Sequence, residues 1–275
     1  GWKEEDGETV WDAPWGRGRP GWHIECSAMS NETLGEHFDI HCGGVDNMFP
    51  HHENEIAQSV CASGRGFVNY WLHSEFLLVD GSKMSKSLGN FYTMKDLKER
   101  NFSSESIRFQ LLSGHYRTKI SFSLGKKIES DKVIQRINDF YRILVNSGAN
   151  DKIGNNLPGV YIEFVDAMND DLNTPKALAV FFTWMKNQMK LIKTESMKDG
   201  QIESAWNFMK IFNNIFGFIK EDKLELSGKV EKLVELREIA RIEKDWILSD
   251  DLRNQISKEG WSIEDTPNGP MLKKL

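Results

Sequence analysis

The chain has 275 residues, of which 39% are hydrophobic and 28% charged, and its net charge is −6. Its length allows two or three domains with a substantial core, and no stretch approaches the roughly 20 apolar residues of a membrane span. The negative charge argues against a dedicated nucleic-acid binder. Three cysteines give no disulfide framework and the N-terminus has no signal or transit peptide, which favours a reducing cytoplasm.

The first 80 residues contain a connecting segment followed by alternating strands and helices. Residues 1–20 contain three tryptophans, glycines and prolines, and we expect an irregular connection with the tryptophans as packing anchors. Residues 21–80 predict the order strand, helix, strand, helix, strand, which is typical of a parallel α/β sheet. Ligands of such sheets bind at the carboxyl ends of the strands. Cys26, Gly43 and the segment after Val79 all fall at predicted strand ends.

A candidate metal site lies within these residues. Pro50 suits the first turn of a helix, and a helix from there places His51 and Glu55 four residues apart on one face. Cys26 can add a thiolate from a neighbouring strand, and sulfur, nitrogen and oxygen donors together suit zinc. The alternative is that His51 and Glu55 form a surface pair on the helix and that Cys26 is a small buried hydrophobic residue.

A strand, a glycine turn and a helix follow one another around residues 37–50. The alternating segment 37–42 leads into Gly43, Gly44 and then Asp46. Such a turn lets backbone N–H groups approach a nucleotide, with Asp46 bonding ribose hydroxyls. The alternative is an ordinary turn between a strand and a helix.

A lysine-rich loop, KMSKS at residues 83–87, follows a predicted strand at 75–79. Lys83 and Lys86 can hold a polyphosphate and neutralise charge as it develops. Glycines on both sides allow the loop to move. The alternative is an ordinary solvated loop.

The rest of the chain is predicted to be mostly helical. One helix is expected near residues 103–112, and from 125 apolar residues recur at three and four positions, which predicts a bundle whose Met and Phe stripes form its core. Thr174 is the expected N-cap of one bundle helix, with Pro175 at its first position. A long charged helix is expected over 229–246, then a helix capped by Ser249, then a strand and turn.

Three strings, taken together in this order and spacing, resemble class I cysteinyl-tRNA synthetases. They are GWHIECSAM, GGxDxxFPHHENE and KMSKSLGN, and further matches lie at 168–175 and near 245–265. The resemblance covers nearly the whole chain. It implies the second half of a Rossmann-type parallel-sheet catalytic domain (21–80), a KMSKS and stem-contact region (81–124), a helical bundle (125–228) and a small anticodon-binding domain (229–275).

The resemblance implies a cysteine–tRNA ligase that activates L-cysteine with ATP, with Mg²⁺ expected, and transfers it from cysteinyl-adenylate to the 3′ end of tRNA(Cys). It implies one Zn²⁺ that binds the substrate thiolate and is held by Cys26, His51 and Glu55, beside Trp22 in the amino-acid pocket. Because a hydroxyl is a far poorer zinc ligand than a thiol, serine would be rejected without an editing domain.

The resemblance also assigns nucleotide and tRNA contacts. Lys83 and Lys86 are implied to act in the transition state of activation, and the backbone of Val79 to contact adenine. The positions that match the anticodon contacts are Trp246, Asp250 and Asp265. An indole can stack on an unpaired base and carboxylates can accept from base amino groups, although composition alone favours Trp246 as a core residue.

Two parts of the family pattern have no match here: a His-x-Gly-His element and a second zinc-ligating cysteine. Cys42 and Cys61 do not match that position and are interpreted as packing residues. The missing N-terminal half is therefore an expected partner of this chain. The complete enzyme is expected to be a monomer, and the isolated chain is expected to be inactive. The alternatives are a paralogous ligase that joins cysteine to an amino-sugar, against which 229–275 argue, and a non-catalytic fragment that binds tRNA or zinc.

Overall fold

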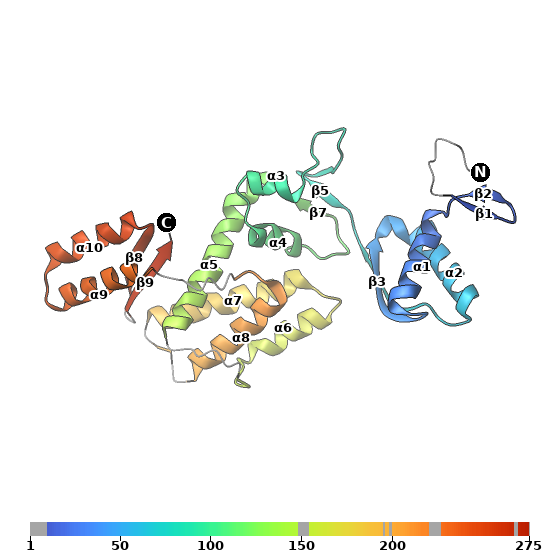
Figure 1. The fold of residues 1–275 in the computed structure, drawn as a ribbon. Coiled ribbons are helices and arrows are strands. Elements are labelled where there is room, and N and C mark those ends of the chain that lie inside the picture. The colour runs from blue at the N-terminus through green and yellow to red at the C-terminus, as the bar shows by residue number, and fades with distance from the viewer. Residues whose placement is uncertain are drawn as a thin grey trace. The chain divides into compact units, whose positions relative to one another are not determined.

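The computed structural model describes residues 10–147, 154–194, 196–197, 200–219, 227–266 and 269–274 (Figure 1). The chain divides into two compact units. The first contains residues 1–100 and 110–125, and the second contains residues 101–109 and 126–275. Among the described helices, none combines the length and the apolar character that a bilayer crossing requires.

The first described elements are two short strands, β1 (Trp11–Ala13) and β2 (Gly16–Gly18), which pair as an antiparallel hairpin. The prediction of an irregular segment was therefore wrong for these residues. Trp15 lies in the turn and is 89% exposed, so it is not a packing anchor. Gly16, at φ 114°, provides the backbone conformation that the tight turn needs.

A βαβ unit forms the centre of the first compact unit. Strand β3 (Phe38–Gly44) leads through helix α2 (Glu53–Ser63) to strand β4 (Val68–Ser74), and the two strands pair in parallel. Helix α2 ends where Gly64 adopts a left-handed conformation, φ 70°. Strand β4 was not predicted; the strand expected after this helix was placed at residues 75–79.

Helix α1 (Trp22–Leu34) packs against α2. The prediction of a strand ending at Cys26 was wrong. The segment has a single β-branched residue before Cys26, and Glu25, Ala28 and Met29 are all good helix formers, so local propensity favours the helix.

A second sheet has the order β6-β5-β7, from β5 (Leu77–Val79), β6 (Ser82–Lys83) and β7 (Ile120–Phe122). Strand β5 pairs in parallel with β7 and antiparallel with β6. The predicted single parallel sheet is thus two small sheets, of which only the β3–β4 and β5–β7 pairs are parallel. Helices α3 (Met94–Glu99) and α4 (Ser104–Leu112) lie between β6 and β7 in the chain, and α4 matches the predicted helix.

The second compact unit contains a helical bundle. Its helices are α5 (Lys127–Asn146), α6 (Val160–Asn169), α7 (Thr174–Lys193) and α8 (Gln201–Phe216). Phe181 of α7 stacks face to face on Phe212 of α8, with ring centroids 3.5 Å apart, and both are fully buried. The expected apolar stripes are therefore core. The cap of α7 is Asn173 and not Thr174, because the Asn173 side chain accepts from the Lys176 N–H.

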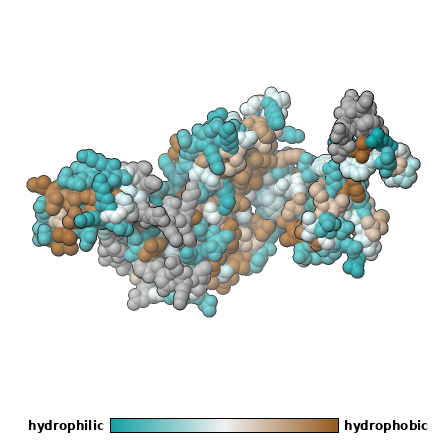
Figure 2. Space-filling view, in the orientation of Figure 1, coloured by the Kyte–Doolittle hydropathy of each residue, from teal (hydrophilic) through white to brown (hydrophobic). Residues whose placement is uncertain are grey.

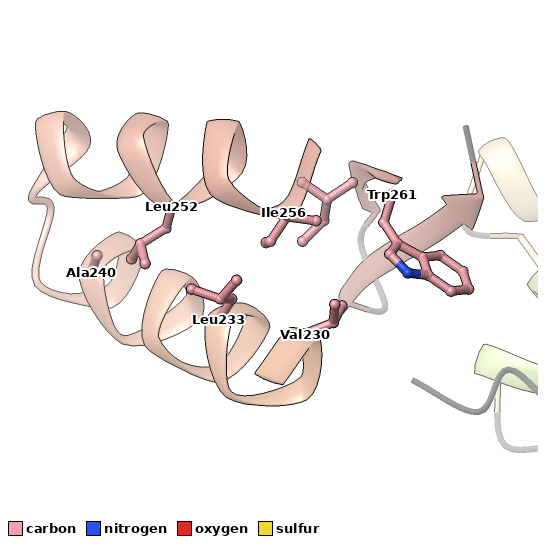
Figure 3. Close-up of a cluster of buried hydrophobic side chains, with 7 residues drawn as sticks. Val230, Leu233, Ala240, Leu252, Ile256 and Trp261 are labelled. Carbon is pink, nitrogen blue, oxygen red and sulfur yellow. The ribbon is translucent and has the colours of Figure 1, made fainter. Parts of the chain in front are cut away.

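The last elements are two helices and a hairpin, α9 (Gly228–Ile242), α10 (Trp246–Lys258), β8 (Trp261–Thr266) and β9 (Gly269–Lys274). Side chains from both helices and from β8 meet in one buried cluster (Figure 3). The predicted helix over 229–246 is broken before Trp246, and Asp245 caps α10 by accepting from the Leu248 N–H. Ser249 is buried inside α10, so it is not the cap.

Candidate functional site

The β3–β4 register brings three ring side chains, His41, Trp71 and His73, together with Gly43 onto one face of the βαβ unit. His41 pairs with Trp71, and Gly43 pairs with His73. The His41 and Trp71 rings stack with their centroids 4.6 Å apart. Because alternate residues of a strand share a face, all four belong to the same side of the sheet. The turn after β3 adds His52 to this side, where its ring lies 4.9 Å from that of His41.

Cys26, His51 and Glu55 converge at one point. Their ligand atoms all lie within 4.8 Å of one another, and His51 Nε2 is 2.7 Å from Glu55 Oε1. Helix α2 (Glu53–Ser63) continues a turn with helical dihedral angles that starts at Pro50, directly after the extended Phe49 (φ −137°, ψ 133°). The predicted i, i+4 relation of His51 and Glu55 is therefore present.

The donor atoms of this cluster suit a cation. Glu55 is completely buried, and its Oε1 makes no hydrogen bond although His51 Nε2 is close to it. A buried carboxylate oxygen without a hydrogen bond is costly, and a shared metal ion would satisfy both atoms. Thiolate, imidazole and carboxylate together form a donor set that zinc accepts. The residues therefore fit zinc, with Cys26 supplied by a helix and not by the predicted strand.

Neighbouring rings orient the cluster. His23 Nδ1 is 2.7 Å from His51 Nδ1, which leaves His51 Nε2 to face Glu55. His41 Nε2 lies 2.8 Å from the other Glu55 oxygen, Oε2. Partners of this kind commonly fix the tautomer and the orientation of metal ligands. Trp22 stacks on His51 with centroids 4.1 Å apart, so the residue predicted to line a pocket does lie beside the cluster.

Burial and nearby charges shift two pKa values here. Burial raises the pKa of the Cys26 thiol, and the carboxylates of Glu55 and Glu25 raise it further. Burial lowers the pKa of His52 to about 4, and the neighbouring His41 adds to this shift. In the protein alone the thiol is therefore protonated and the His52 imidazole neutral at pH 7.

Four further histidines, which no sequence motif singled out as candidate site residues, surround the cluster: His23, His41, His52 and His73. Their pairing depends on the β3–β4 register and on the packing of α1 against α2. A compositional signal was present, since six of the seven histidines lie between residues 23 and 73.

Side chains of this chain explain why the last two positions of β3 are glycines. A Cβ at Gly43 would lie 2.5 Å from Cε1 and 2.8 Å from Nε2 of His52, and one at Gly44 would overlap Asp46 Oδ1. Gly43 therefore makes room for the His52 ring. Asp46 is exposed in the short 3₁₀ turn Val45–Asn47. Nucleotide contact by these three residues stays a prediction.

Two family models match the chain. The class I (C) tRNA synthetase catalytic domain matches residues 1–132, and the DALR domain matches residues 163–220. A cysteine–tRNA ligase from Protochlamydia amoebophila is 46% identical over 98% of this chain and 58% of its own length. One from Chlamydia caviae is 43% identical over 99% of this chain and 59% of its own length.

Over nearly its whole length, this chain is homologous to cysteine–tRNA ligases. It spans about three fifths of the length of the curated relatives it matches. Among solved structures, the LeuRS–tRNA–LeuAMS ternary complex of Agrobacterium radiobacter K84 is similar over 80% of this chain and 34% of that chain, with a TM-score of 0.58 and 13% identity. That likeness concerns the fold alone. The family match confirms a class I catalytic domain followed by a DALR domain.

The lysine loop is exposed, and hydrogen bonds between its own residues hold its shape. The Asn90 side chain accepts from the Ser85 N–H and donates to the Lys83 carbonyl. The ammonium groups of Lys83 and Lys86 lie over the rings of Phe76 and Phe91, at 5.4 and 5.5 Å. Within the described part of the chain, neither lysine has a hydrogen bond or ion pair to the cysteine–histidine cluster.

Val79 lies in the middle strand β5, between Ser82 of β6 and Phe122 of β7, and is 3% exposed. The predicted contact between the Val79 backbone and adenine stays a prediction. Cys42 and Cys61 are exposed, so the interpretation of both as packing residues was wrong.

The predicted tRNA contacts differ in their surroundings. Trp246 is 56% exposed and is therefore not a core residue, and the Arg241 guanidinium lies 5.9 Å from its ring centre. Asp250 is also exposed on α10. Figure 2 shows hydrophobic surface over this end of the α9–α10 pair, where Ile242 and Ile247 are exposed.

Asp265 instead lies among arginines. Its carboxylate accepts two hydrogen bonds from the buried Arg237, at 2.8 and 2.9 Å, and also contacts Arg241 and Arg253. These bonds, chiefly those from Arg237, hold the pKa of Asp265 below its usual range. The carboxylate is engaged within its own domain, and base contact by Asp265 stays a prediction.

Proposed function

We propose that this chain provides the thiol-selective metal site and the lysine loop of a cysteine–tRNA ligase. The enzyme activates L-cysteine with ATP and transfers it through cysteinyl-adenylate to tRNA(Cys). The observation that carries the proposal is the convergence of Cys26, His51 and Glu55 beside the Trp22 ring. The names of the relatives, at 40–46% identity over nearly the whole chain, support it.

The site's own residues explain selection of a thiol. Cys26, His51 and Glu55 would hold the zinc ion, and zinc supplies an acceptor for a substrate thiolate that binds a hydroxyl poorly. His23 fixes the His51 ring, and Trp22, exposed on its outer side, forms a wall for the bound amino acid. A hydrogen-bonded or metal-bonded group can reject an analogue that a shape-only pocket would admit.

The lysine loop supplies charge for the activation step. In the proposal, Lys83 and Lys86 leave their aromatic neighbours and contact the phosphates of ATP, which arrives with Mg²⁺, as charge develops on the leaving pyrophosphate. Both ammonium groups are exposed and have no carboxylate within ion-pair distance among the described residues. Gly43, Gly44, Asp46 and the Val79 backbone are assigned to the nucleoside, and Trp246, Asp250 and Asp265 to the tRNA.

The remaining part of the ligase fold is proposed to cover the second face of the β3–β4 sheet. On that face Ile40 and Tyr70 are 57% and 67% exposed. The family's longer relatives have the length to supply an N-terminal half that buries these side chains and completes the zinc ligands. The complete enzyme is proposed to act as a monomer in a reducing cytoplasm, which the free thiols support.

The first experiment measures metal content and cysteine-dependent ATP–pyrophosphate exchange. The chain joined to the N-terminal part of a close relative is expected to bind zinc and exchange pyrophosphate, and the chain alone is expected not to exchange it. Cys26→Ser should lose both zinc and exchange, whereas Cys61→Ser, at an exposed thiol, should keep both. Full zinc content and normal cysteine affinity in Cys26→Ser would contradict the site.

The second experiment separates the roles of the loop and the pocket. Lys86→Ala is expected to lower the rate of adenylation by roughly 10²-fold or more, as for the loss of one transition-state contact, with little change in cysteine binding. A raised KM with unchanged kcat would mean that Lys86 contributes only ground-state binding.

A further inference from the structure

We propose that Asn90 is a positioning residue of the lysine loop, whose side-chain amide holds the loop backbone so that Lys83 and Lys86 extend from an ordered segment. The inference rests on the proposed function of the two lysines and names a residue that acts through them. Asn90 is not assigned a contact with ATP, cysteine or tRNA. Its role is to fix the main chain from which the charged groups reach the phosphates.

The Asn90 side chain joins two points of the loop backbone. Its Oδ1 accepts from the Ser85 N–H at 2.8 Å, and its Nδ2 donates to the Lys83 carbonyl at 3.1 Å. A backbone N–H can only donate and a backbone carbonyl can only accept, so the two partners determine which way the amide points. Neither a carboxylate nor a hydroxyl of the same reach can make both bonds in this arrangement, because one bond needs an N–H donor beside an oxygen acceptor.

These contacts begin where the sheet ends. Lys83 is the last residue of β6, and the residues that follow it as far as Asn90 belong to no strand or helix. The amide therefore extends the order of the sheet edge to Ser85, the residue directly before Lys86. Gly89, at φ 66°, then donates its N–H to the Lys86 carbonyl, and this turn brings the chain back to Asn90.

The lysine side chains can move while the backbone is held. The ammonium of Lys83 lies 5.4 Å from the ring centre of Phe76, and that of Lys86 lies 5.5 Å from the ring centre of Phe91. Both rings are partly exposed, at 37% and 41%, so these contacts are weak and can be exchanged for contacts with a phosphate. The amide bonds act on the main chain and need not break when the side chains turn. A backbone ordered before ATP arrives loses less entropy in the transition state.

The first experiment is a double-mutant cycle, measured as pyrophosphate exchange in the chain completed with an N-terminal half. Asn90→Ala is expected to lower kcat by roughly tenfold, as for a small displacement of a catalytic group, and to leave the KM for cysteine unchanged. In a Lys86→Ala or a Lys83→Ala background the same change should cost less than about threefold, because the group it positions is gone. The matched control is Asn31→Ala, at an exposed position of α1, which should match wild type.

The outcomes separate this inference from the function on which it rests. If Lys86→Ala leaves exchange unchanged, the role of the lysines fails and the inference fails with it. If Lys86→Ala lowers exchange but Asn90→Ala does not, only the inference fails. It also fails if the Asn90 and lysine effects multiply fully, because Asn90 then acts independently of the ammonium groups.

The second experiment needs no activity and uses the chain by itself. Trypsin cleaves after Lys83 and Lys86, within the loop, and mass spectrometry follows each cleavage. Asn90→Ala is expected to speed both cleavages by roughly tenfold, as for the loss of two hydrogen bonds. Cleavage after Lys119, an exposed lysine outside the loop, should not change, which shows that the fold is intact. Equal cleavage of the loop in Asn90→Ala and wild type would mean that the amide does not order it, and would overturn the inference.

Discussion

Replacing Asp265 with asparagine should destabilise the domain formed by α9, α10 and the β8–β9 hairpin. Arg237, whose guanidinium is the main partner of Asp265, is 1% exposed, and the carboxylate receives two of its hydrogen bonds. Arg241 and Arg253 contact the same carboxylate. Asparagine keeps the shape but removes the charge, so three arginines would lose their common counter-ion.

The size of the effect follows from the burial of the two partners. Breaking a buried ion pair by removing one partner costs about 3–5 kcal/mol. The Asp265 side chain is 33% exposed, and an asparagine oxygen can still accept one bond from Arg237, so we expect about 2–3 kcal/mol. With a urea m value of about 1–2 kcal/mol/M for a small domain, the unfolding midpoint should fall by about 1–3 M.

The assay is urea unfolding followed by the indole N–H signal of Trp261, which lies in the core of this domain (Figure 3). The matched control is Asp250→Asn, at an exposed carboxylate on α10, which should change the unfolding free energy by less than about 0.5 kcal/mol. An unchanged midpoint in Asp265→Asn would refute the assignment of a structural role to the arginine cluster.

The same pair gives a pH dependence with a definite sign. The bonds to Arg237 lower the pKa of Asp265 in the folded protein, whereas in the unfolded chain an aspartate titrates near pH 4. The unfolded state therefore takes up the proton first as the pH falls, so this contribution is present above about pH 4 and is lost through the lower, folded pKa. The difference in stability between wild type and Asp265→Asn should shrink over that range, and a constant difference would contradict the linkage.

Three further changes test other parts of the chain. Gly43→Ala should displace the His52 ring and lower the unfolding free energy of its unit by about 1–3 kcal/mol, whereas Gly66→Ala, with ordinary contacts only, should change it by less than about 0.5 kcal/mol; equal stabilities would contradict the packing argument. Trp246→Ala should leave the unfolding free energy within about 0.5 kcal/mol but weaken tRNA binding by about 1–3 kcal/mol in a filter assay of the completed enzyme; unchanged binding would remove Trp246 from the interface. Phe181→Ala should destabilise the bundle by about 3–5 kcal/mol in thermal unfolding, without changing metal content. A smaller loss would mean that neighbouring side chains move in to fill the cavity left by the phenyl ring.

Local patterns in the sequence were sufficient for much of the fold. The strand at 38–44 and the helix α4 follow from periodicity and flanking residues, and the i, i+4 spacing of His51 and Glu55 brings their side chains together as predicted. These features depend on residues only a few positions apart. The predicted caps of α7 and α10 were misplaced by one and four residues, because several side chains that can cap a helix lie close together in the sequence there.

Features that depend on distant residues were not predictable in this way. Cys26 was predicted to lie on a strand but lies on α1, because an expected alternation of strands and helices was given more weight than the helix propensity of the residues themselves. His23 and His51 are 28 positions apart, and His52 and His73 are 21 apart. Their contacts depend on tertiary packing, which no local pattern encodes.

The burial of Glu55 connects the fold of this unit to its metal chemistry. A carboxylate removed from water is costly unless cations or hydrogen bonds compensate it, and here both of its oxygens face imidazole nitrogens. A bound ion would compensate the charge better than the imidazole rings alone, so metal binding should stabilise the packing of α1, α2 and β3 as well as prepare the site. In the proposed metal site, the cysteine, the histidines and the buried carboxylate would therefore be structural as well as functional, and a chelator should lower the stability of this unit while leaving the helical bundle unchanged.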